Sequence, residues 1–431
     1  MLGTYKHFFA NFAQWSFFGS IVGLVVGSTT TFLLKTNDYL GNVRLQSDWL
    51  ILLLPFGGII IGYLYMNYGK VYLNHTYHDT SELNNLVIDA VHGTKKVPVR
   101  MGPIVYIGTF ITVLLGGSTG REGAAVQMGG SVATAVINFF KVNKLDSKIL
   151  MMSGISAGFG AAFGAPITGV VFGMEMASIG KLRLEAMVPC LTASFVGHYV
   201  TTACWGHQHE EFTIQSIPEL SLILFFKVLV LSVIFSLISV LYCQLRHGIQ
   251  NFSETFFKKN HMKRAFFGGI VLVALTFMIG SQDYNGRGIE MLEQSFIEEI
   301  PPFSFLAKLI FTAISLGSGF VGGEAIPLFF IGATLGNALH TFVDLPLSFL
   351  AALGLISVFS AGTNTPLSAF LLAMEMFNGK GLEYFFVACL ISFLFSGHHG
   401  LWPAQKIYEP KSRLYKLPRG ETIENVEKKT T

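Results

Sequence analysis

The run Gly-Ser-Thr-Gly-Arg-Glu-Gly-Ala-Ala (residues 117–125) interrupts a long apolar stretch and decides the class of fold. Over residues 101–140, Arg121 and Glu122 are the only charged side chains. Charge inside a membrane is costly, so an ionisable residue there indicates a functional site. The glycines break the helix, and free backbone amides at the start of the next helix can bind an anion. An acid beside an anion site predicts an anion transporter, coupled to protons if the acid titrates.

The composition of the chain indicates an integral membrane protein. Of the 431 residues, 51% are apolar, 13% are charged and 40 are phenylalanines, whereas soluble chains carry about a quarter charged residues. Apolar runs recur throughout, so no separate soluble domain is expected. The net charge of +3 is small, and no nucleic-acid partner is expected. The sequence contains no nucleophile elbow, phosphate-binding loop or zinc-protease motif, so neither an enzyme nor a cofactor or metal is expected.

Many of the apolar segments are too short to cross a membrane. They lie at residues 103–115, 123–139, 147–160 and 166–177 in the first half and at 302–315, 326–340, 347–360 and 366–377 in the second. A helix rises about 1.5 Å per residue and the hydrocarbon core is about 30 Å thick. Some of these helices must therefore end midway, buried in protein or lining a cavity.

The two halves of the chain repeat each other. The pattern of proline followed by Met-Glu-Met at 166–176 recurs at 366–376, 200 residues later. Upstream, Gly-Arg-Glu-Gly-Ala (120–124) is matched by Gly-Glu-Ala-Ile-Pro (323–327). Repeats with interrupted helices at matching positions are typical of transporters that bind their substrate near the middle of the membrane.

We expect residues 1–405 to form one all-α transmembrane domain. Two antiparallel repeats, about 18–205 and 218–400, should consist of tilted helices, some of them half a membrane long, around one anion path. The remaining tail, 406–431, is polar and carries seven lysines and arginines. Basic segments favour the cytoplasmic side, so both termini are expected there, in a multi-pass protein of the cell membrane.

At this point the sequence resembles a known family. Gly-Arg-Glu-Gly (120–123) is similar to the gating-glutamate motif of the CLC anion channels and antiporters. The segment 81–91, the Gly-x-x-x-Pro at 323–327 and the region near residue 400 resemble further family motifs in the same order. The resemblance extends to about residue 405, and it implies the CLC fold.

Three details resemble the fluoride/proton antiporter branch of that family. Ala124 stands where the chloride branch has proline, Glu324 is present, and Asn-Asn-Leu (84–86) replaces the Gly-Ser-Gly-Ile-Pro of the chloride branch. The resemblance implies secondary-active export of fluoride from the cell in exchange for protons. A chloride-transporting or unselective channel or antiporter is the alternative.

The resemblance gives roles to two acids. Glu122 corresponds to the external gate, whose carboxylate competes with the anion for the same amides and leaves when it is protonated. Glu324, the only charge over residues 309–343, replaces the internal proton glutamate of the chloride antiporters, whose own position falls on Met176. Two alternatives stay open. Glu122 could pair with Arg121, although adjacent helix residues are poorly placed for this, and Glu324 could cap a helix.

The resemblance also implies the residues that bind the anion. They are Leu83 or Asn84, with a register open by one position, and Gly123, Ala124, Ala325, Ile326 and Trp402. Several depart from the fluoride branch, which often has threonine in place of Ile326 and usually tyrosine in place of Trp402. An indole N–H can donate one hydrogen bond, as a phenol can, but from a different position.

Further expectations concern partners and the remaining polar residues. The resemblance implies a homodimer with one pathway per subunit, joined through helices near 166–177, 185–203, 366–377 and 381–395. Glu175 and Glu375 occupy matching positions of the repeats, and we expect structural roles for both. His207 and His209 lie in a polar loop, where solvated histidines are more common than metal ligands.

Overall fold

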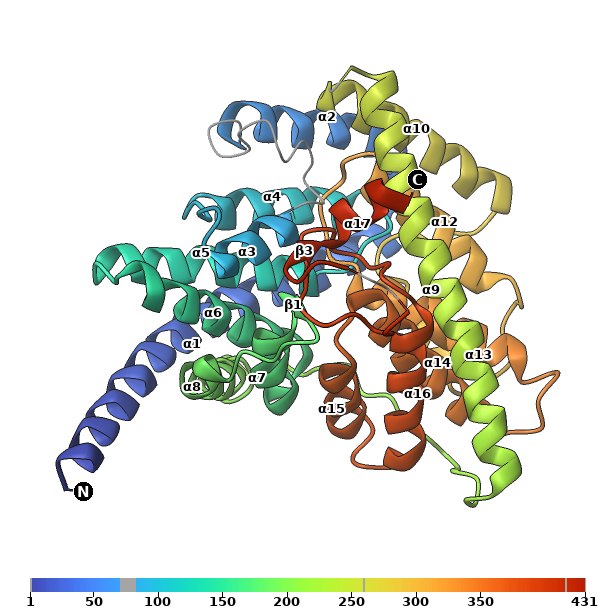
Figure 1. Cartoon of the computed structure of the whole chain (residues 1–431). Helices are drawn as coiled ribbons and strands as arrows, with labels where there is room; N and C mark the ends of the chain where they lie inside the picture. Colours follow the sequence, from blue (N-terminus) through green and yellow to red (C-terminus); the bar gives the residue numbers. More distant parts are fainter. Residues whose placement is uncertain (1, 70–82, 259, 415–416, 431) are drawn as a thin grey trace.

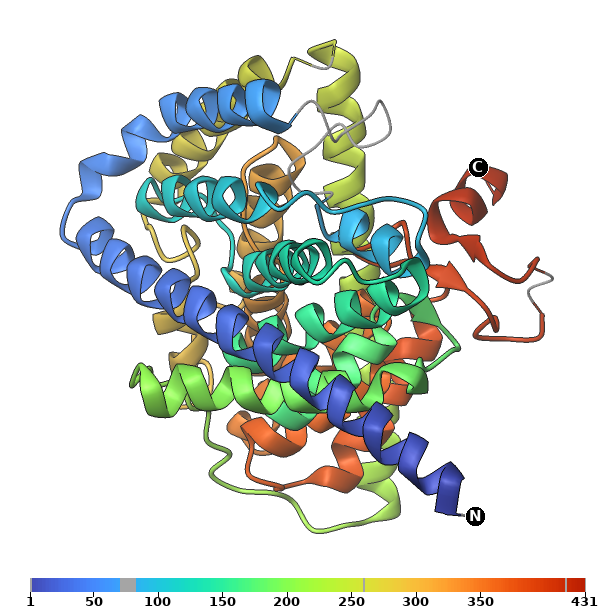
Figure 2. The same cartoon turned by 90° about the vertical axis from the view of Figure 1, so that its left-hand side faces the viewer.

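The computed structural model describes residues 2–69, 83–258, 260–414 and 417–430. Positions 81–82 of the segment 81–91 and residues 415–416 and 431 of the tail lie outside the described residues. Figure 1 shows that the first half, coloured blue to green, and the second half, coloured yellow to red, form the two sides of one helical molecule. Figure 2 shows the long first helix crossing the face of the first half.

The helices follow the same order in both halves. The first half contains α1 (Leu2–Leu45), η1 (Asp48–Leu53), α2 (Leu54–Leu64), η2 (Tyr65–Gly69), α3 (Leu83–His92), α4 (Met101–Leu114), α5 (Glu122–Phe139), α6 (Lys144–Phe163), α7 (Pro166–Glu175), η4 (Leu184–Ala186), α8 (Met187–Tyr199) and η5 (Val200–Cys204). The second half contains α9 (Leu222–Phe256), α10 (His261–Ile279), α11 (Ile289–Gln294), α12 (Ser304–Gly317), α13 (Ala325–Leu339), α14 (Leu347–Thr363), α15 (Pro366–Met376) and α16 (Leu382–Phe395). The series α4–α8 thus matches α12–α16, as the repeat predicts.

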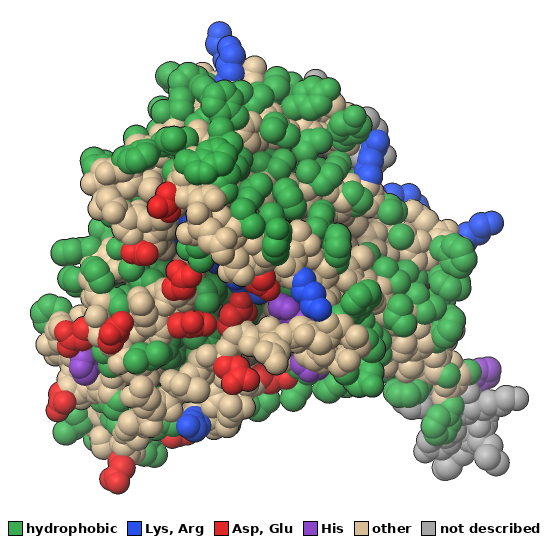
Figure 3. All heavy atoms as spheres, turned by 180° about the vertical axis from the view of Figure 1, so that it is seen from behind, with side chains coloured by type: hydrophobic (Ala, Val, Ile, Leu, Met, Phe, Trp, Pro, Cys, Tyr) green, Lys and Arg blue, Asp and Glu red, His purple; other side chains and the backbone are tan. Residues whose placement is uncertain are grey.

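Long and short helices occur together, as expected. Four described segments are long and apolar enough to cross a membrane by length and composition: Phe9–Leu45, Asp48–Gly69, Leu222–Phe256 and His261–Ile279. Six shorter apolar helices, of 10–17 residues, include α13, α14 and α15. Hydrophobic side chains cover much of the surface seen in Figure 3, and acidic ones gather in its middle and lower parts. This is the surface that a bilayer requires around a polar path.

The breaks before the short helices have a local cause that is the same in both repeats. Helix α6 ends at Gly164 (φ +69°) and α14 at Asn364 (φ +58°), both in the left-handed conformation. Glycine adopts this conformation freely and asparagine tolerates it. Pro166 and Pro366 then occupy the first positions of α7 and α15, where proline costs no hydrogen bond. Each pair therefore ends one helix and starts the next in a new direction.

Reciprocal hydrogen bonds join the two repeats at these short helices. The Glu175 carboxylate at the end of α7 accepts from the amides of Leu367 (3.1 Å) and Ser368 (2.8 Å) at the start of α15. The Glu375 carboxylate, in the last turn of α15, accepts from Ile167 (2.9 Å) and Thr168 (2.7 Å) at the start of α7. Each acid satisfies amides that a helix start leaves unpaired. The expected structural roles of both acids are confirmed.

Glycines let the helices of each repeat pack backbone to backbone. A Cβ atom at Gly129 of α5 would lie 2.1 Å from the Gly154 carbonyl oxygen of α6, and one at Gly332 of α13 would lie 2.2 Å from that of Gly354 in α14. Close approach through small residues is typical of membrane helices.

The tail packs against the helical body. A small sheet has the order β1–β2–β3, in which β1 (Ser178–Ile179) pairs in parallel with β2 (Lys406–Ile407) and β2 pairs antiparallel with β3 (Glu421–Thr422). Helix α17 (Ile423–Thr430) follows. Lys411 donates through Nζ to the Phe393 carbonyl (2.8 Å) and the Ser396 hydroxyl (2.7 Å). Within the described residues this sheet is the only addition to the expected all-α architecture.

Candidate functional site

The starts of α5 and α13 meet in the interior of the molecule. Gly120 and Gly323 exchange two backbone hydrogen bonds, at 2.7 and 2.6 Å, in an isolated antiparallel bridge. A Cβ atom at Gly123 would lie 2.9 Å from the Gly323 Cα atom, so only glycine permits this approach. Two helix N-termini, each with unpaired amides and the positive end of a dipole, therefore converge on one point.

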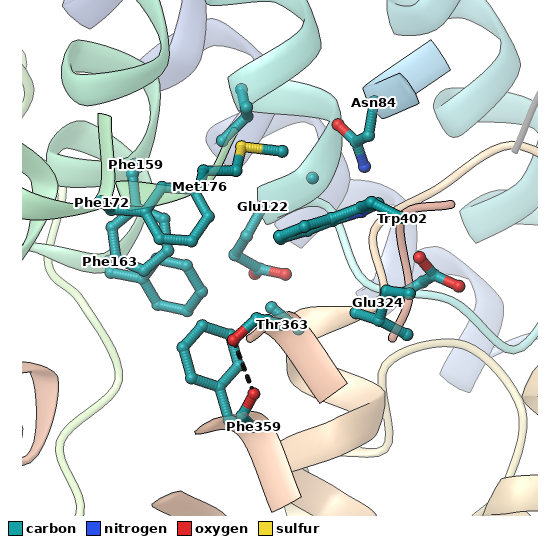
Figure 4. Close-up of a pocket in the computed structure, with 14 residues that line it drawn as sticks. Asn84, Glu122, Phe159, Phe163, Phe172, Met176, Glu324, Phe359, Thr363 and Trp402 are labelled. Carbon is teal, nitrogen blue, oxygen red and sulfur yellow. Dashed lines mark hydrogen bonds between the residues drawn. The ribbon is translucent and has the colours of Figure 1, made fainter. Parts of the chain in front are cut away.

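A small cavity lies at this point, as Figure 4 shows. Six of the predicted site residues line it: Asn84, Glu122, Gly123, Glu324, Ala325 and Trp402. Met176, where the sequence resemblance puts the internal glutamate of the chloride antiporters, lines it as well. The site thus combines residues from the starts of α5 and α13, from α3 and from the segment around Trp402.

Three predicted residues do not line this cavity. Ala124 and Ile326 are buried beside it, because successive residues of a helix face different directions. Leu83 lines a separate cavity with Leu86, Met101 and other residues. Of the two residues that the uncertain register left open, the structure therefore brings Asn84 to the cavity.

The Glu122 carboxylate already occupies a position that suits an anion. Its Oε2 accepts a hydrogen bond from the Arg121 amide (3.0 Å), and the side chain is 3% exposed. The Arg121 Nε lies 3.6 Å from Oε1, an ion pair without a hydrogen bond, as expected for neighbours that are poorly placed to pair. Arg121 precedes the helix, with φ −117° and ψ −17°, and its side chain is not bound by helical geometry.

Arg121 belongs to a ring of four charges that the sequence did not reveal. Its guanidinium pairs with Asp38 of α1 and with Glu210 (2.9 Å), and Arg287 pairs with the same two acids, at 2.9 and 2.6 Å. These residues come from four separate segments. Burial raises the pKa of Glu210, but the positive charges of Arg121 and Arg287 outweigh this effect and lower the pKa to about 2. One member of the ring, Glu210, belongs to the loop that carries His207.

The Glu324 carboxylate also has partners that the sequence analysis missed. It lies at the N-cap of α13 without a capping hydrogen bond from its side chain. Instead its Oε1 is 3.2 Å from Arg246 Nε and accepts from the Tyr242 hydroxyl at 3.4 Å. Arg246 is a single arginine in a long apolar stretch of α9, a signal that the cost of intramembrane charge could have identified. The capping role for Glu324 is not supported.

Two polar groups of the cavity have no hydrogen-bond partner among the described residues. They are the indole Nε1 of Trp402 and the side-chain Oδ1 of Asn84, both buried. The Asn84 Nδ2 points toward Gly123, 3.6 Å from where a Cβ would be. A buried donor without a partner is rare in proteins. The Trp402 N–H is therefore a candidate ligand for an anion. The Thr363 hydroxyl, by contrast, is bound to the Phe359 carbonyl at 2.7 Å (Figure 4).

The comparisons with known proteins agree with this geometry. The family model described as voltage gated chloride channel matches residues 57–397. The chain belongs to this family, the CLC family. It is 37% identical over 93% of its length to "Chloride/fluoride channel protein" of Pseudomonas syringae pv. tomato, of which 88% is covered. A second relative, the H(+)/Cl(-) exchange transporter ClcA of Yersinia pestis, is 26% identical over 64% of this chain and 61% of its own.

Solved structures of the CLC family match the whole architecture. One, titled "Crystal structure of a CLC-type fluoride/proton antiporter", superposes with a TM-score of 0.86 at 30% identity and covers 92% of this chain and 98% of that one. A slow cyanobacterial Cl−/H+ antiporter matches with a TM-score of 0.75 at 18% identity, over 89% and 94%. This CLC protein is accordingly an all-α membrane protein.

The histidine loop of this CLC protein differs from the expectation. His207 is buried, 8% exposed, and its ring lies 5.0 Å from that of His209. Burial, with a smaller contribution from the charge of His207, lowers the pKa of His209 to about 4, so its ring is neutral at neutral pH. Within the described residues no group of three His, Cys, Asp or Glu side chains is placed to hold a metal. The expectation of solvated rings is wrong for His207, and the loop contributes Glu210 to the ring of charges.

An aromatic wall closes the cavity on the side opposite Glu324. Phe159 stacks on Phe172 with ring centroids 4.1 Å apart, and Phe172 meets Trp402 edge to face at 6.0 Å. Phe163 and Phe359 complete it, as Figure 4 shows. The edges of aromatic rings carry partial positive charge. Such a wall excludes water without repelling a small anion.

Proposed function

We propose that this CLC protein is a secondary-active antiporter that exports fluoride from the cell in exchange for protons. The observation that carries the proposal is the cavity itself, because two buried acids, Glu122 and Glu324, line it where the N-termini of α5 and α13 converge. Two names refer to fluoride: that of the 37% identical relative, a chloride/fluoride channel protein, and that of the solved structure at 30% identity.

In this proposal Glu122 is both a gate and a proton carrier. Its carboxylate holds the Arg121 amide, which an anion would otherwise use. Protonation removes the charge that competes with the anion, and the neutral side chain then leaves the amide. One proton taken up at Glu122 thus opens the path for one competing anion, and this couples the two movements. Glu324 forms the inner half of the proton route.

The anion is bound by donors from four parts of the chain. The helix starts contribute the backbone amides of Gly123 and Ala325, Asn84 contributes its side-chain amide, and Trp402 contributes its indole N–H. Fluoride is smaller and more strongly hydrated than chloride, so its site must replace water by several good donors. Helix starts supply donors without a full positive charge. Ala124 and Ile326, one position further along their helices, fill the space behind these amides.

The proposal includes a homodimer in the cell membrane, with one pathway in each subunit and both termini in the cytoplasm. Helices α7, α8, α15 and α16 would form the dimer face, where Leu191, Phe195 and Phe386 are each 45% exposed. The basic tail supports the cytoplasmic placement. No enzymatic activity is part of the proposal. Protons, fluoride and the bilayer are the partners.

Purified protein in liposomes tests the choice of anion. Liposomes loaded with either fluoride or chloride would be diluted into an impermeant buffer, and the anion that appears outside would be recorded with selective electrodes. We expect fluoride efflux to exceed chloride efflux at least tenfold, a difference of about 1.4 kcal/mol in the barrier. Equal rates would favour the second candidate, an unselective or chloride-transporting CLC protein, which the likeness to the Yersinia exchanger supports.

A further inference from the structure

We propose that Arg246 is the positioning residue that keeps Glu324 able to release its proton. Among the described residues the contacts to the Glu324 carboxylate come from one helix, α9, which crosses the second repeat. The inference rests on the proposed proton route through Glu324. It adds Arg246 as the group that allows Glu324 to release its proton.

The geometry gives Arg246 a defined place. Tyr242 and Arg246 lie one turn apart on α9, and both contact the same carboxylate oxygen, Oε1 of Glu324, at 3.4 and 3.2 Å. The Arg246 side chain is 1% exposed and that of Glu324 is 6% exposed. Water therefore contributes little to stabilising either charge. The contacts orient the carboxylate through Oε1, and Oε2 is the oxygen that remains for a proton.

A buried carboxyl needs such a partner in order to cycle. Moving an isolated carboxylate out of water is so unfavourable that the group stays protonated. A proton carrier that never releases its proton cannot carry one. An arginine at 3.2 Å stabilises the charged form, and because its guanidinium does not deprotonate in proteins, this support does not change with pH.

Among the described residues, the titratable groups that face Glu324 are Tyr242 and Arg246 on α9 and, across the cavity, Glu122 at the start of α5. Glu122, Trp402 and Glu324 line the same cavity (Figure 4). The positive charge beside Glu324 thus comes from α9, while Glu122 is associated with Arg121. Each acid of the proposed proton route thus lies beside a different arginine.

The chain offers a matched control for a purely structural arginine. Arg264 on α10 is also 1% exposed and lies 3.2 Å from a glutamate, Glu254. It donates to the Gly317 carbonyl at 2.8 Å. Neither Arg264 nor Glu254 lines the cavity. Arg246 and Arg264 therefore share burial and pairing, and they differ in whether their acid faces the anion.

The experiment compares Arg246→Gln, Glu324→Gln and Arg264→Gln in liposomes, with proton uptake per fluoride measured from pH 5 to pH 9. We expect Arg246→Gln to reduce this ratio about tenfold or more at pH 7 and to restore it at higher pH, with the profile displaced by about one to three pH units. Glu324→Gln should lose coupling at every pH, because no acid remains to titrate. Arg264→Gln should keep the wild-type ratio and profile.

Two further variants keep the test decisive if Arg246→Gln does not fold. The double variant Arg246→Gln/Glu324→Gln removes both charges and leaves no unpaired ion, and it should fold better than Arg246→Gln alone. Arg246→Lys keeps the positive charge and should keep most of the coupling, with a smaller displacement of the profile.

Each outcome separates this inference from the function on which it rests. If Glu324→Gln is uncoupled, normal coupling and an unchanged pH profile in Arg246→Gln would overturn the role of Arg246. If Arg246→Gln does not fold, a loss of coupling in Arg246→Lys at all pH values would overturn it. Normal proton uptake in Glu324→Gln would instead overturn the proposed proton route, and with it this inference. Absence of fluoride movement in the wild type would overturn the proposed function.

Discussion

The residue that connects anion and proton in this account is Glu122. Its side chain is almost fully buried, yet its carboxylate accepts from the Arg121 amide at the start of α5. The sequence predicted this residue because it stands in an apolar run, where charge is rare. It could not predict Asp38, Glu210 and Arg287, because the ring that they form with Arg121 joins segments up to 249 residues apart.

Replacement of Glu122 tests its double role. Glu122→Gln keeps the size of the side chain but removes both the charge and the proton. We expect fluoride to move while proton uptake falls to the background of empty liposomes, and fluoride flux should no longer vary with pH. Glu211→Gln, in an exposed loop position, is the control and should pump normally. Stoichiometric proton uptake by Glu122→Gln would contradict the assignment of Glu122 as the proton carrier.

Glu210 provides a test of stability rather than transport. Because its pKa in the folded protein is lowered to about 2, its ion pairs stabilise the fold above the ordinary carboxyl value of 4.5. This stability is lost as the pH falls through the range between 4.5 and 2. Glu210→Gln should lower the free energy of unfolding at pH 7 by about 1.5–3 kcal/mol and flatten its decline toward pH 3. Thermal unfolding in detergent measures both effects, and an unchanged decline would contradict the ring.

At the scale of elements, the broken helices were the most predictable part of the fold. Glycine, asparagine and proline at 164, 166, 364 and 366 mark the breaks, and the matching Met-Glu-Met patterns indicate the repeat. The partner of each glutamate was not predictable, because a repeat in the sequence does not say which ends meet. The structure shows that each short helix caps the other.

The reciprocal caps predict symmetric effects. Glu175→Gln and Glu375→Gln each weaken hydrogen bonds from two amides and a hydroxyl to a charged oxygen. We expect each to lower stability by about 1.5–3 kcal/mol, with proton coupling per fluoride unchanged. The double variant should cost close to the sum, because the caps occupy opposite ends of the α7–α15 pair. Uncoupled transport in either single variant would show that the acid acts in the proton route.

At the scale of the whole molecule, the sequence predicted the family, the all-α fold and most of the residues that line the cavity. Six of the expected site residues converge where the repeats meet. Ala124 and Ile326 are buried but do not line this cavity, and Leu83 lines a separate one. The error is one residue along a helix, which turns a side chain by about 100°. Motif spacing locates a helix start well and the direction of each side chain less well.

Proton movement driven by fluoride tests the central claim most directly. Liposomes containing the wild-type protein would be given an outward fluoride gradient with no proton gradient, and the external pH would be recorded. The account predicts that protons enter the liposomes as fluoride leaves, so that a proton gradient builds up where none existed. An equal chloride gradient should move at least tenfold fewer protons. Fluoride efflux without any proton uptake, once the membrane potential is clamped, would contradict it.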